Sequence, residues 1–279
     1  MTRTTTAIRV GVGGWTFEPW RDNFFPKGLA QKRELEYATR QLTAIEVNAT
    51  YYSTMKPASF KKWHDETPDN FMFSLKANRF ATNRRVLGEA GDSISRFVDS
   101  GLGELGKKLG PIVWQFAPTK QFKAEDFEAF LSLLPKDTDG HKLRHVMDVR
   151  HDSFKSTDYL KLARKYKCAT VFTDSPKFPS FADLTGDFAY VRLMNSEEEE
   201  KTGYPPKALD RWAIAAQAWA KGGEPDDLPR VKAKGKAGKA RDVFVYFING
   251  AKERAPAAAQ ALLSQLGFKP HEGTAPKLV

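Results

Sequence analysis

The chain has 279 residues and a mass of 31.4 kDa, enough for one large barrel or for two ordinary domains. Hydrophobic residues make up 41 % of it, a globular composition, and no apolar run is long enough to cross a bilayer. The formal net charge of +10 raises the question of an anionic partner, so the distribution of the charge matters.

The N-terminal stretch contains no long apolar segment of the kind found in signal peptides, and the sequence moves directly into a strand pattern. The single cysteine, Cys168, has no second cysteine with which to form an internal disulfide. Both features predict a cytoplasmic protein without a membrane span.

Short apolar segments rich in β-branched residues recur along the chain and predict eight strands. In chain order they are Ile8–Gly13, Ala44–Asn48, Phe71–Ala77, Ile112–Phe116, Arg144–Val149, Ala169–Thr173, Phe188–Leu193 and Val243–Ile248.

Most of these strands are separated by apolar residues with helical spacing, as in Leu35, Ala38, Thr39 and Leu42. Eight buried strands that alternate with helices predict an α/β fold, a TIM-like (β/α)₈ barrel in one domain over residues 1–279. An open doubly wound sheet is the alternative. Between Thr173 and Phe188 two prolines and no helical period occur, so the sixth helix should be reduced or missing.

Polar side chains stand at the carboxyl end of nearly every predicted strand. In a parallel barrel these ends line the mouth at which active sites form, so we expect the side chains to converge there. They are Glu46, Asn48, Lys76, Gln115, Asp148, Arg150, His151, Asp174, Arg192 and Asn249.

Two interpretations of this set remain open, and both can hold at once. The charges could pair among themselves and stabilise the barrel, because an unpaired buried charge is costly. Alternatively, Lys76, Arg150 and Arg192 could hold a small anionic or polyhydroxyl ligand, with Glu46 or Asp148 as the catalytic acid or base. Trp15, in the aromatic loop after the first strand, could add a stacking surface for that ligand.

Metal ions and nucleotide cofactors are not expected. Of the five histidines only His151 follows a strand directly, whereas a catalytic zinc site usually needs several imidazoles. The carboxylates could hold magnesium, but their spacing does not require it. The glycine-rich VGVGGW lacks the full dinucleotide-binding spacing.

The excess of positive charge is partly local. Residues 230–241 read RVKAKGKAGKAR, contain no acid, and belong to a segment at about 222–241 that we predict to be a flexible basic insertion. In a barrel this segment joins a helix to the next strand, so it should lie on the lower face, whereas Glu197–Glu200 should lie on the upper face. A nucleic-acid-binding or nucleic-acid-processing protein that uses this basic surface is therefore the alternative function.

Several motifs in order give the chain a resemblance to a known family. GVGGWTFEPWRDNFFP, AIEVNATYYST, LGPIVWQFAPT, VMDVRHDSF and VFVYFINGAKERAPAAAQAL are similar to motifs of the YecE-like family, the domain of unknown function numbered 72. The resemblance covers nearly the whole chain and implies a TIM-barrel-like fold. It implies no established reaction.

The chain departs from the family's pattern at several positions that could carry chemistry. The resemblance implies a histidine at the position of Met194 and another at the position of Asn83. It also implies the motif YFNND at residues 246–250, where this chain reads YFING. Ile248 therefore replaces an asparagine, and Gly250 replaces the aspartate. These departures could alter or abolish a family activity, whereas Glu46, Asn48, Asp148, Arg150, His151 and Arg192 match the family's pattern. The sequence thus predicts an enzyme or binding protein for a small ligand at the barrel mouth, and leaves the reaction and the oligomeric state open.

Overall fold

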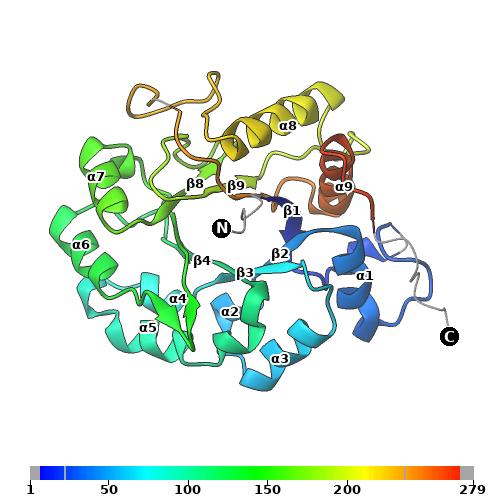
Figure 1. Ribbon diagram of the computed structural model, residues 1–279, viewed down its shortest axis with the longest axis horizontal. Helices are drawn as coiled ribbons and strands as arrows, with labels where there is room; N and C mark the ends of the chain where they lie inside the picture. Colours follow the sequence, from blue (N-terminus) through cyan, green and yellow to red (C-terminus); the bar gives the residue numbers. More distant parts are fainter. Residues whose placement is uncertain (1–6, 22, 236, 271–279) are drawn as a thin grey trace.

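The computed structural model describes residues 7–21, 23–235 and 237–270. Eight parallel strands form a closed barrel in the order β1-β10-β9-β8-β7-β4-β3-β2, with β2 pairing back to β1. Figure 1 shows helices arranged around this ring of strands. The predicted (β/α)₈ barrel is confirmed. The strands are β1 Ile8–Gly13, β2 Ala44–Val47, β3 Met72–Lys76, β4 Leu109–Gln115, β7 His145–Asp148, β8 Ala169–Thr173, β9 Ala189–Leu193 and β10 Val243–Phe247.

The helices that cover the barrel follow most of these strands. They are α1 Glu34–Gln41, α2 Ala49–Tyr52, α3 Pro57–Asp65, α4 Arg79–Thr82, α5 Gly91–Val98, α6 Ala124–Ser132, α7 Thr157–Lys165, α8 Pro206–Ala220 and α9 Ala255–Gln265. Short 3₁₀ turns occur at Glu18–Trp20, Gln31–Arg33, Leu87–Glu89, Leu102–Lys108, Asp152–Phe154 and Lys252–Arg254. A hairpin of β5 Asp137–Thr138 and β6 His141–Lys142 precedes β7.

One strand differs from its predicted bounds by more than a residue. The fourth barrel strand begins at Leu109 rather than at Ile112, and it contains Pro111, which cannot donate a backbone hydrogen bond. The pairing with β3 shifts register between Phe73 and Leu75, and this irregularity accommodates the proline.

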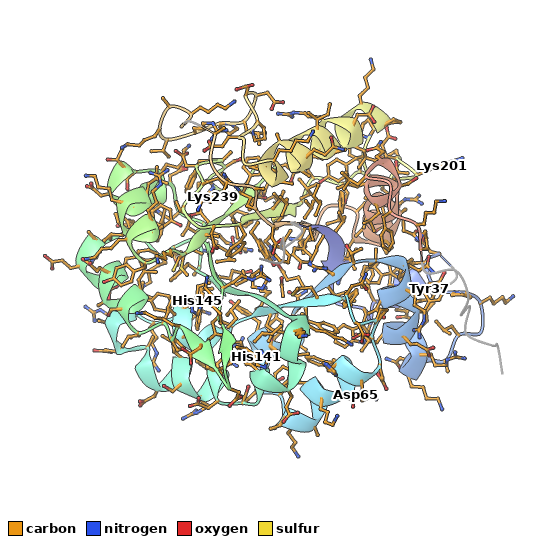
Figure 2. All side chains as sticks on the ribbon, viewed as in Figure 1. Tyr37, Asp65, His141, His145, Lys201 and Lys239 are labelled. Carbon is orange, nitrogen blue, oxygen red and sulfur yellow. The ribbon has the colours of Figure 1, made fainter. Side chains whose placement is uncertain are left out.

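Alternate side chains of each strand point to the helices or into the barrel, as the pleat requires. The outward residues belong to a large apolar core between strands and helices. The inward residues form a second, smaller cluster that fills the barrel, and Figure 2 shows side chains occupying the ring. The interior is therefore packed, and two members of this cluster, Met194 and Ile248, lie just beyond the strand ends at the mouth. The members are Ala44, Val113, Val146, Ala169, Val171, Phe188, Tyr190, Met194, Phe244, Tyr246 and Ile248.

The crossover between β8 and β9 contains no helix, although all of its residues are described, so the expectation of a missing sixth helix is confirmed. A segment of the α8–β10 connection lies beside it instead. The Ala182 amide donates to the Pro229 carbonyl at 2.7 Å, and the Asp183 carboxylate accepts from the amides of Val231 and Lys232 at 2.7 and 3.0 Å. Two irregular segments thus bind each other where a helix would otherwise lie.

The same contacts bear on the basic tract, which lies on the lower face because it leads into the first residue of β10. Arg230 forms an ion pair with Glu224 and donates to the Ala182 and Pro225 carbonyls. Lys234 pairs with Asp226, whereas Lys232 and Lys239 are exposed and Lys236 lies outside the described residues. The first part of the insertion is therefore anchored to the barrel, and flexibility of the remainder stays a prediction.

No helix in the described part of the chain has both the length and the apolar character needed to span a membrane.

Candidate functional site

Arg192 stands at the centre of the upper end of the barrel. It occupies the fourth position of β9, two residues after Tyr190, so it points inward by the period of the strand. Its Nη1 donates to Asp148 Oδ2 at 2.6 Å and its Nη2 donates to Glu46 Oε1 at 3.1 Å. The side chains of Arg192, Glu46 and Asp148 are 2 %, 0 % and 6 % exposed, so this is a buried ion-pair triad.

The charges of the triad stabilise one another. Burial alone would lower the pKa of Arg192, but the carboxylates of Glu46 and Asp148 raise it above its ordinary value. Burial would likewise raise the pKa of Asp148, yet Arg192 and Arg150 together hold it below the ordinary value. Asp148 is therefore ionised at neutral pH, and it can accept a proton but has none to give.

Tyrosines support the triad from below. The Tyr190 hydroxyl donates to Glu46 Oε2 at 2.8 Å, and its ring lies 5.2 Å from the ring of Tyr246. The Tyr246 hydroxyl is 2.7 Å from the Ser74 hydroxyl. Tyr190 is not among the predicted site residues, although its spacing of two residues from Arg192 places both on the same face of one strand.

Arg150 extends the cluster toward the rim. Its Nε and Nη2 donate to Asp148 Oδ2 at 3.2 and 2.9 Å, and Nη2 also donates to Gln115 Oε1 at 2.8 Å. The guanidinium lies 4.4 Å from the ring centroid of Phe178, which belongs to the irregular β8–β9 crossover. No pattern in the sequence pointed to Phe178, because that crossover has no regular period.

Lys76, the last residue of β3, is 6 % exposed. Its Nζ lies 4.3 Å from the centroid of the Tyr51 ring and has no hydrogen bond or ion pair to any residue that the structure describes. Burial, followed by repulsion from Arg192, lowers the pKa of Lys76 to about 8. A buried ammonium without a carboxylate partner of its own is unusual, because desolvating it is costly.

The cluster thus has unequal numbers of charges and unused hydrogen-bonding atoms. Lys76, Arg150 and Arg192 face only two carboxylates, so the group has one positive charge more than it has negative charges. Among the described residues, Lys76 Nζ, Arg150 Nη1, Arg192 Nε and Asp148 Oδ1 have no hydrogen-bond partner, and Arg192 Nε is fully buried. In the part of the chain that the structure describes, Lys76 Nζ and Arg150 Nη1 are therefore unpaired cationic donors, and Asp148 Oδ1 is an unpaired carboxylate acceptor, at the upper end of the barrel.

Two other predicted site residues lie at strand ends near the cluster. Asn48 follows β2, and its Nδ2 would be 3.0 Å from a Cβ atom on Gly13, so the glycine leaves room for this amide at the top of β1. His151 follows β7, and its Nδ1 accepts from the Ser153 amide at 3.2 Å. That contact turns the imidazole toward its own loop.

Asp174 and Asn249 are engaged in loop structure. Asp174 Oδ1 accepts from the Met194 amide at 2.6 Å, and Oδ2 accepts from the Tyr204 hydroxyl at 2.7 Å. Burial raises the pKa of Asp174. Asn249 is exposed, and its carbonyl accepts from the Ser196 hydroxyl at 2.9 Å. These contacts join the loops that follow β8, β9 and β10.

Trp15 is half-buried and packs edge-on against Trp63 and Phe73, with ring centroids 5.3 and 6.4 Å away. Both partners belong to the apolar layer between the strands and the helices. The structure therefore brings Trp15 to the outer layer, and its ring contacts among the described residues are with Trp63 and Phe73 and not with the charged cluster.

The departures from the family's motifs have structural counterparts. Met194 and Ile248 are buried members of the apolar barrel interior. Gly250 has φ +85°, and a Cβ atom there would lie 2.4 Å from the Ser196 carbonyl oxygen. A carboxylate at this position would therefore need a rebuilt loop. Asn83 is exposed and lines a surface cavity of about 460 Å³ on the upper face.

Within residues 7–21, 23–235 and 237–270, no three His, Cys, Asp or Glu side chains are placed to hold a metal ion together. The expectation that the protein uses no metal or cofactor remains a prediction.

Comparison with known proteins places the chain in a family. A family model described as "Protein of unknown function DUF72" matches residues 9–278. UPF0759 protein YunF of Bacillus subtilis strain 168 is 26 % identical over 124 residues, which are 43 % of each chain. UPF0759 protein YecE of Escherichia coli strain K12 is 25 % identical over 150 residues, 53 % of this chain and 50 % of that one. The matched stretches thus span half or less of these curated relatives.

Solved structures share the fold over a longer range. A DUF72 family protein from Thermotoga maritima MSB8 superposes with a TM-score of 0.71 at 20 % identity, covering 94 % of this chain and 99 % of that chain. A DUF72 family protein from Enterococcus faecalis V583 has a TM-score of 0.68 at 17 % identity, with 95 % and 99 % covered. SacUVDE has a TM-score of 0.54 at 12 % identity, with 94 % and 99 % covered. The match of the family model over nearly the whole sequence shows that this chain belongs to the DUF72 family.

Proposed function

We propose that the protein binds a small hydroxylated anion, of the sugar-acid or sugar-phosphate class, at the upper mouth of the barrel. The observation that carries this proposal is Lys76, a side chain that is 6 % exposed and whose ammonium makes no hydrogen bond or ion pair among the described residues. A ligand anion would supply the missing charge and the missing hydrogen bonds together.

The neighbouring groups favour an anion that also carries hydroxyls. Arg150 Nη1 offers a second cationic donor, and Asp148 Oδ1 offers an acceptor for a hydroxyl hydrogen. A neutral sugar would satisfy Asp148 and leave Lys76 without a counter-charge. A simple carboxylate would satisfy Lys76 and leave Asp148 Oδ1 without a donor.

The same geometry supports proton transfer at the bound ligand. Asp148 is ionised and its Oδ1 is unpaired among the described residues, so it is the candidate to accept a proton, and the two arginines that lower its pKa also lower its strength as a base. Glu46 is fully buried, and both of its oxygens already accept hydrogen bonds, from Arg192 and from Tyr190. Its role in this proposal is to position Arg192 rather than to touch the ligand.

Calorimetric titration at neutral pH with gluconate, glycerol 3-phosphate and glucose tests the proposal. We expect one of the two anions to bind more tightly than glucose. Lys76→Met should weaken that binding at least about tenfold, or about 1.4 kcal/mol, because the counter-charge is lost. The matched control is Lys142→Met, since Lys142 is 77 % exposed and belongs to the β5–β6 hairpin.

Circular dichroism of both variants should show the barrel intact before affinities are compared. Failure of both anions to bind the wild-type protein, or an equal loss of affinity in the two lysine variants, would contradict an anion site at Lys76.

A further inference from the structure

A second group of cations surrounds the cavity of about 460 Å³ on the upper face. The cavity lies between the loops that follow β3 and β4, so it opens on the same side of the barrel as the mouth. Arg84, Arg85, Lys120 and Lys123 line it, and Asp126 is its one acidic lining residue.

These four cations have no carboxylate partners in the part of the chain that the structure describes. Arg84 donates to the Phe80 carbonyl at 2.9 Å and to the Ser93 hydroxyl at 2.7 Å. Lys120 donates to the carbonyls of Arg84 and Arg85. Asp126 forms no ion pair with them among the described residues, and its Oδ1 accepts from the Leu87 and Gly88 amides at 2.6 and 3.2 Å. Neutral groups thus position Arg84 and Lys120, and the lining has four cations for one carboxylate.

A buried hydroxyl in the wall of the cavity also lacks a partner. Thr82 is 1 % exposed, and its fully buried Oγ1 makes no hydrogen bond among the described residues. Buried polar atoms are normally hydrogen-bonded, so this atom calls for a bound water or for a rotation of the side chain that turns the hydroxyl into the cavity. Turned that way, a hydroxyl beside several cations matches the donors that proteins use for phosphate oxygens.

Two exposed aromatic residues stand on the same face of the barrel as the cavity, Tyr52 in α2 and Phe80 in α4, two residues before the cavity-lining Thr82. Tyr52 and Phe80 are 63 % and 60 % exposed, and the Arg79 guanidinium lies 5.9 and 5.6 Å from their ring centroids. The backbone carbonyl of Phe80 accepts a hydrogen bond from Arg84, so the segment that carries the Phe80 ring is bonded to a residue of the cavity. Tyr52 joins it to the barrel mouth, because its ring lies 5.1 Å from the ring of Tyr51, which contacts Lys76.

We infer that this upper-face surface binds a single-stranded nucleic acid, with a backbone phosphate at the Arg84, Arg85, Lys120 and Lys123 cavity and bases stacked on Tyr52 and Phe80. The four cations supply the attraction to phosphates, and exposed rings supply the stacking. A duplex keeps its bases stacked internally, so the two rings favour a single strand. The surface is distinct from the basic tract on the lower face, where Arg230 and Lys234 already pair with acids.

Fluorescence anisotropy with labelled oligothymidylate and oligouridylate of about 12 nucleotides, and a duplex of equal length, tests this inference. The salt concentration is varied from about 50 to 200 mM. Arg85→Ser/Lys123→Ser removes two exposed cations whose side chains make no hydrogen bond among the described residues. We expect at least a tenfold loss of single-strand affinity at the lowest salt, and a salt slope shallower by about 1.4, since each phosphate contact contributes about 0.7.

Two further variants identify the source of the effect. Lys232→Ser/Lys239→Ser removes the same charge from exposed positions of the lower-face tract and should leave affinity nearly unchanged. Tyr52→Ser/Phe80→Ser should lower affinity about tenfold or more with the salt slope preserved, because stacking involves no counterion release. Comparison of the two oligonucleotides shows whether the strand is DNA or RNA.

Equal losses in the upper-face and lower-face double variants would overturn the inference, because net charge alone would then explain binding. Tighter binding of the duplex than of either single strand would also overturn it. Binding of inorganic phosphate at the cavity, without binding of either oligonucleotide, would assign the site to a small ligand and contradict a strand.

Discussion

An arginine binds a carboxylate at both ends of the barrel interior, but the surroundings of the two arginines differ. At the lower end Arg144 donates to Asp242 at 2.9 Å, and its guanidinium lies 4.9 and 5.5 Å from the rings of Phe244 and Phe188. At the upper end Arg192 binds two carboxylates, and no aromatic ring covers the guanidinium among the described contacts. Arg144 therefore packs against aromatic rings at the lower end of the barrel, whereas Arg192 binds the carboxylates of Glu46 and Asp148 at the upper end.

The difference shows that an arginine–carboxylate pair does not by itself mark a site. The lower pair is 20 % and 33 % exposed, so water screens both it and the second cation beside it, Arg9, which interacts with Asp242 and is repelled by Arg144. The upper triad is almost completely buried, and it adjoins Lys76, a cation without a carboxylate partner in the described structure. The feature that points to a ligand is a largely buried cation, Lys76, that has no carboxylate partner in the described structure although it lies beside the triad.

The largest effect should come from Arg192→Met. The substitution leaves Glu46 and Asp148 buried without their shared cation, and breaking a buried ion pair in this way costs about 3–5 kcal/mol of unfolding free energy. Urea denaturation followed by circular dichroism measures the loss. Because the single variant could fail to fold, Arg192→Met/Glu46→Gln serves as its partner and should recover part of the stability.

A loss below about 1 kcal/mol in the single variant would contradict the comparison, since the upper triad would then behave like an exposed pair.

An intermediate effect should come from the pH dependence of stability. The folded-state pKa of Lys76 is about 8 and its ordinary value is 10.5. Between these two pH values the unfolded chain binds more protons, so the unfolding free energy of the wild-type protein should rise with pH, by at most about 3 kcal/mol. Affinity for an anionic probe at the mouth should fall over the same range, because the ammonium is lost.

Other lysines and tyrosines titrate in this range too, so the measured quantity is the difference in unfolding free energy between the wild-type protein and Lys76→Met from pH 7 to 11. If the difference in unfolding free energy between the two proteins did not change with pH, the pKa of Lys76 would be the same in the folded and unfolded chain, and burial would not lower it.

The smallest effect should come from Asp242→Asn at the lower end. The pair with Arg144 is partly exposed, and the asparagine retains an oxygen that can accept from the Ala7 amide or from Arg144. We expect a loss of about 1 kcal/mol or less and unchanged binding of gluconate or glycerol 3-phosphate at the mouth. A loss comparable to that of Arg192→Met would remove the distinction between the two ends.

Much of the architecture follows from local pattern. Segments such as Ala44–Val47 and Ala189–Leu193 show the strand period, and that period alone puts Glu46 and Arg192 on inward positions. The barrel then brings their carboxyl ends together, so convergence of the charged side chains could be expected before any coordinates.

The partners of each charge could not be predicted in the same way. Glu46 and Arg192 are 146 residues apart, and nothing local indicates that Arg192 binds both carboxylates while Lys76 binds neither. That choice depends on the register between strands and on side-chain length. The engagement of Asp174 with Tyr204, through a loop without regular period, is equally invisible in the sequence.

The α8–β10 connection has two parts that differ in how they contact the barrel. The part around Leu228 to Lys232 is hydrogen-bonded to the β8–β9 crossover, and the described residues of the part that follows it are not. Leu228 is buried and Arg230 bonds to the Ala182 and Pro225 carbonyls, so opening the chain there would uncover the barrel where it has no sixth helix. From Ala233 onward the described residues up to Ala240 are exposed. New termini or an inserted domain should therefore be tolerated beside Gly235 and not beside Leu228, nor beside Lys239, where the Gly238 amide donates to the Gly222 carbonyl at 2.8 Å. The loop thus offers a place for circular permutation on the lower face of the barrel.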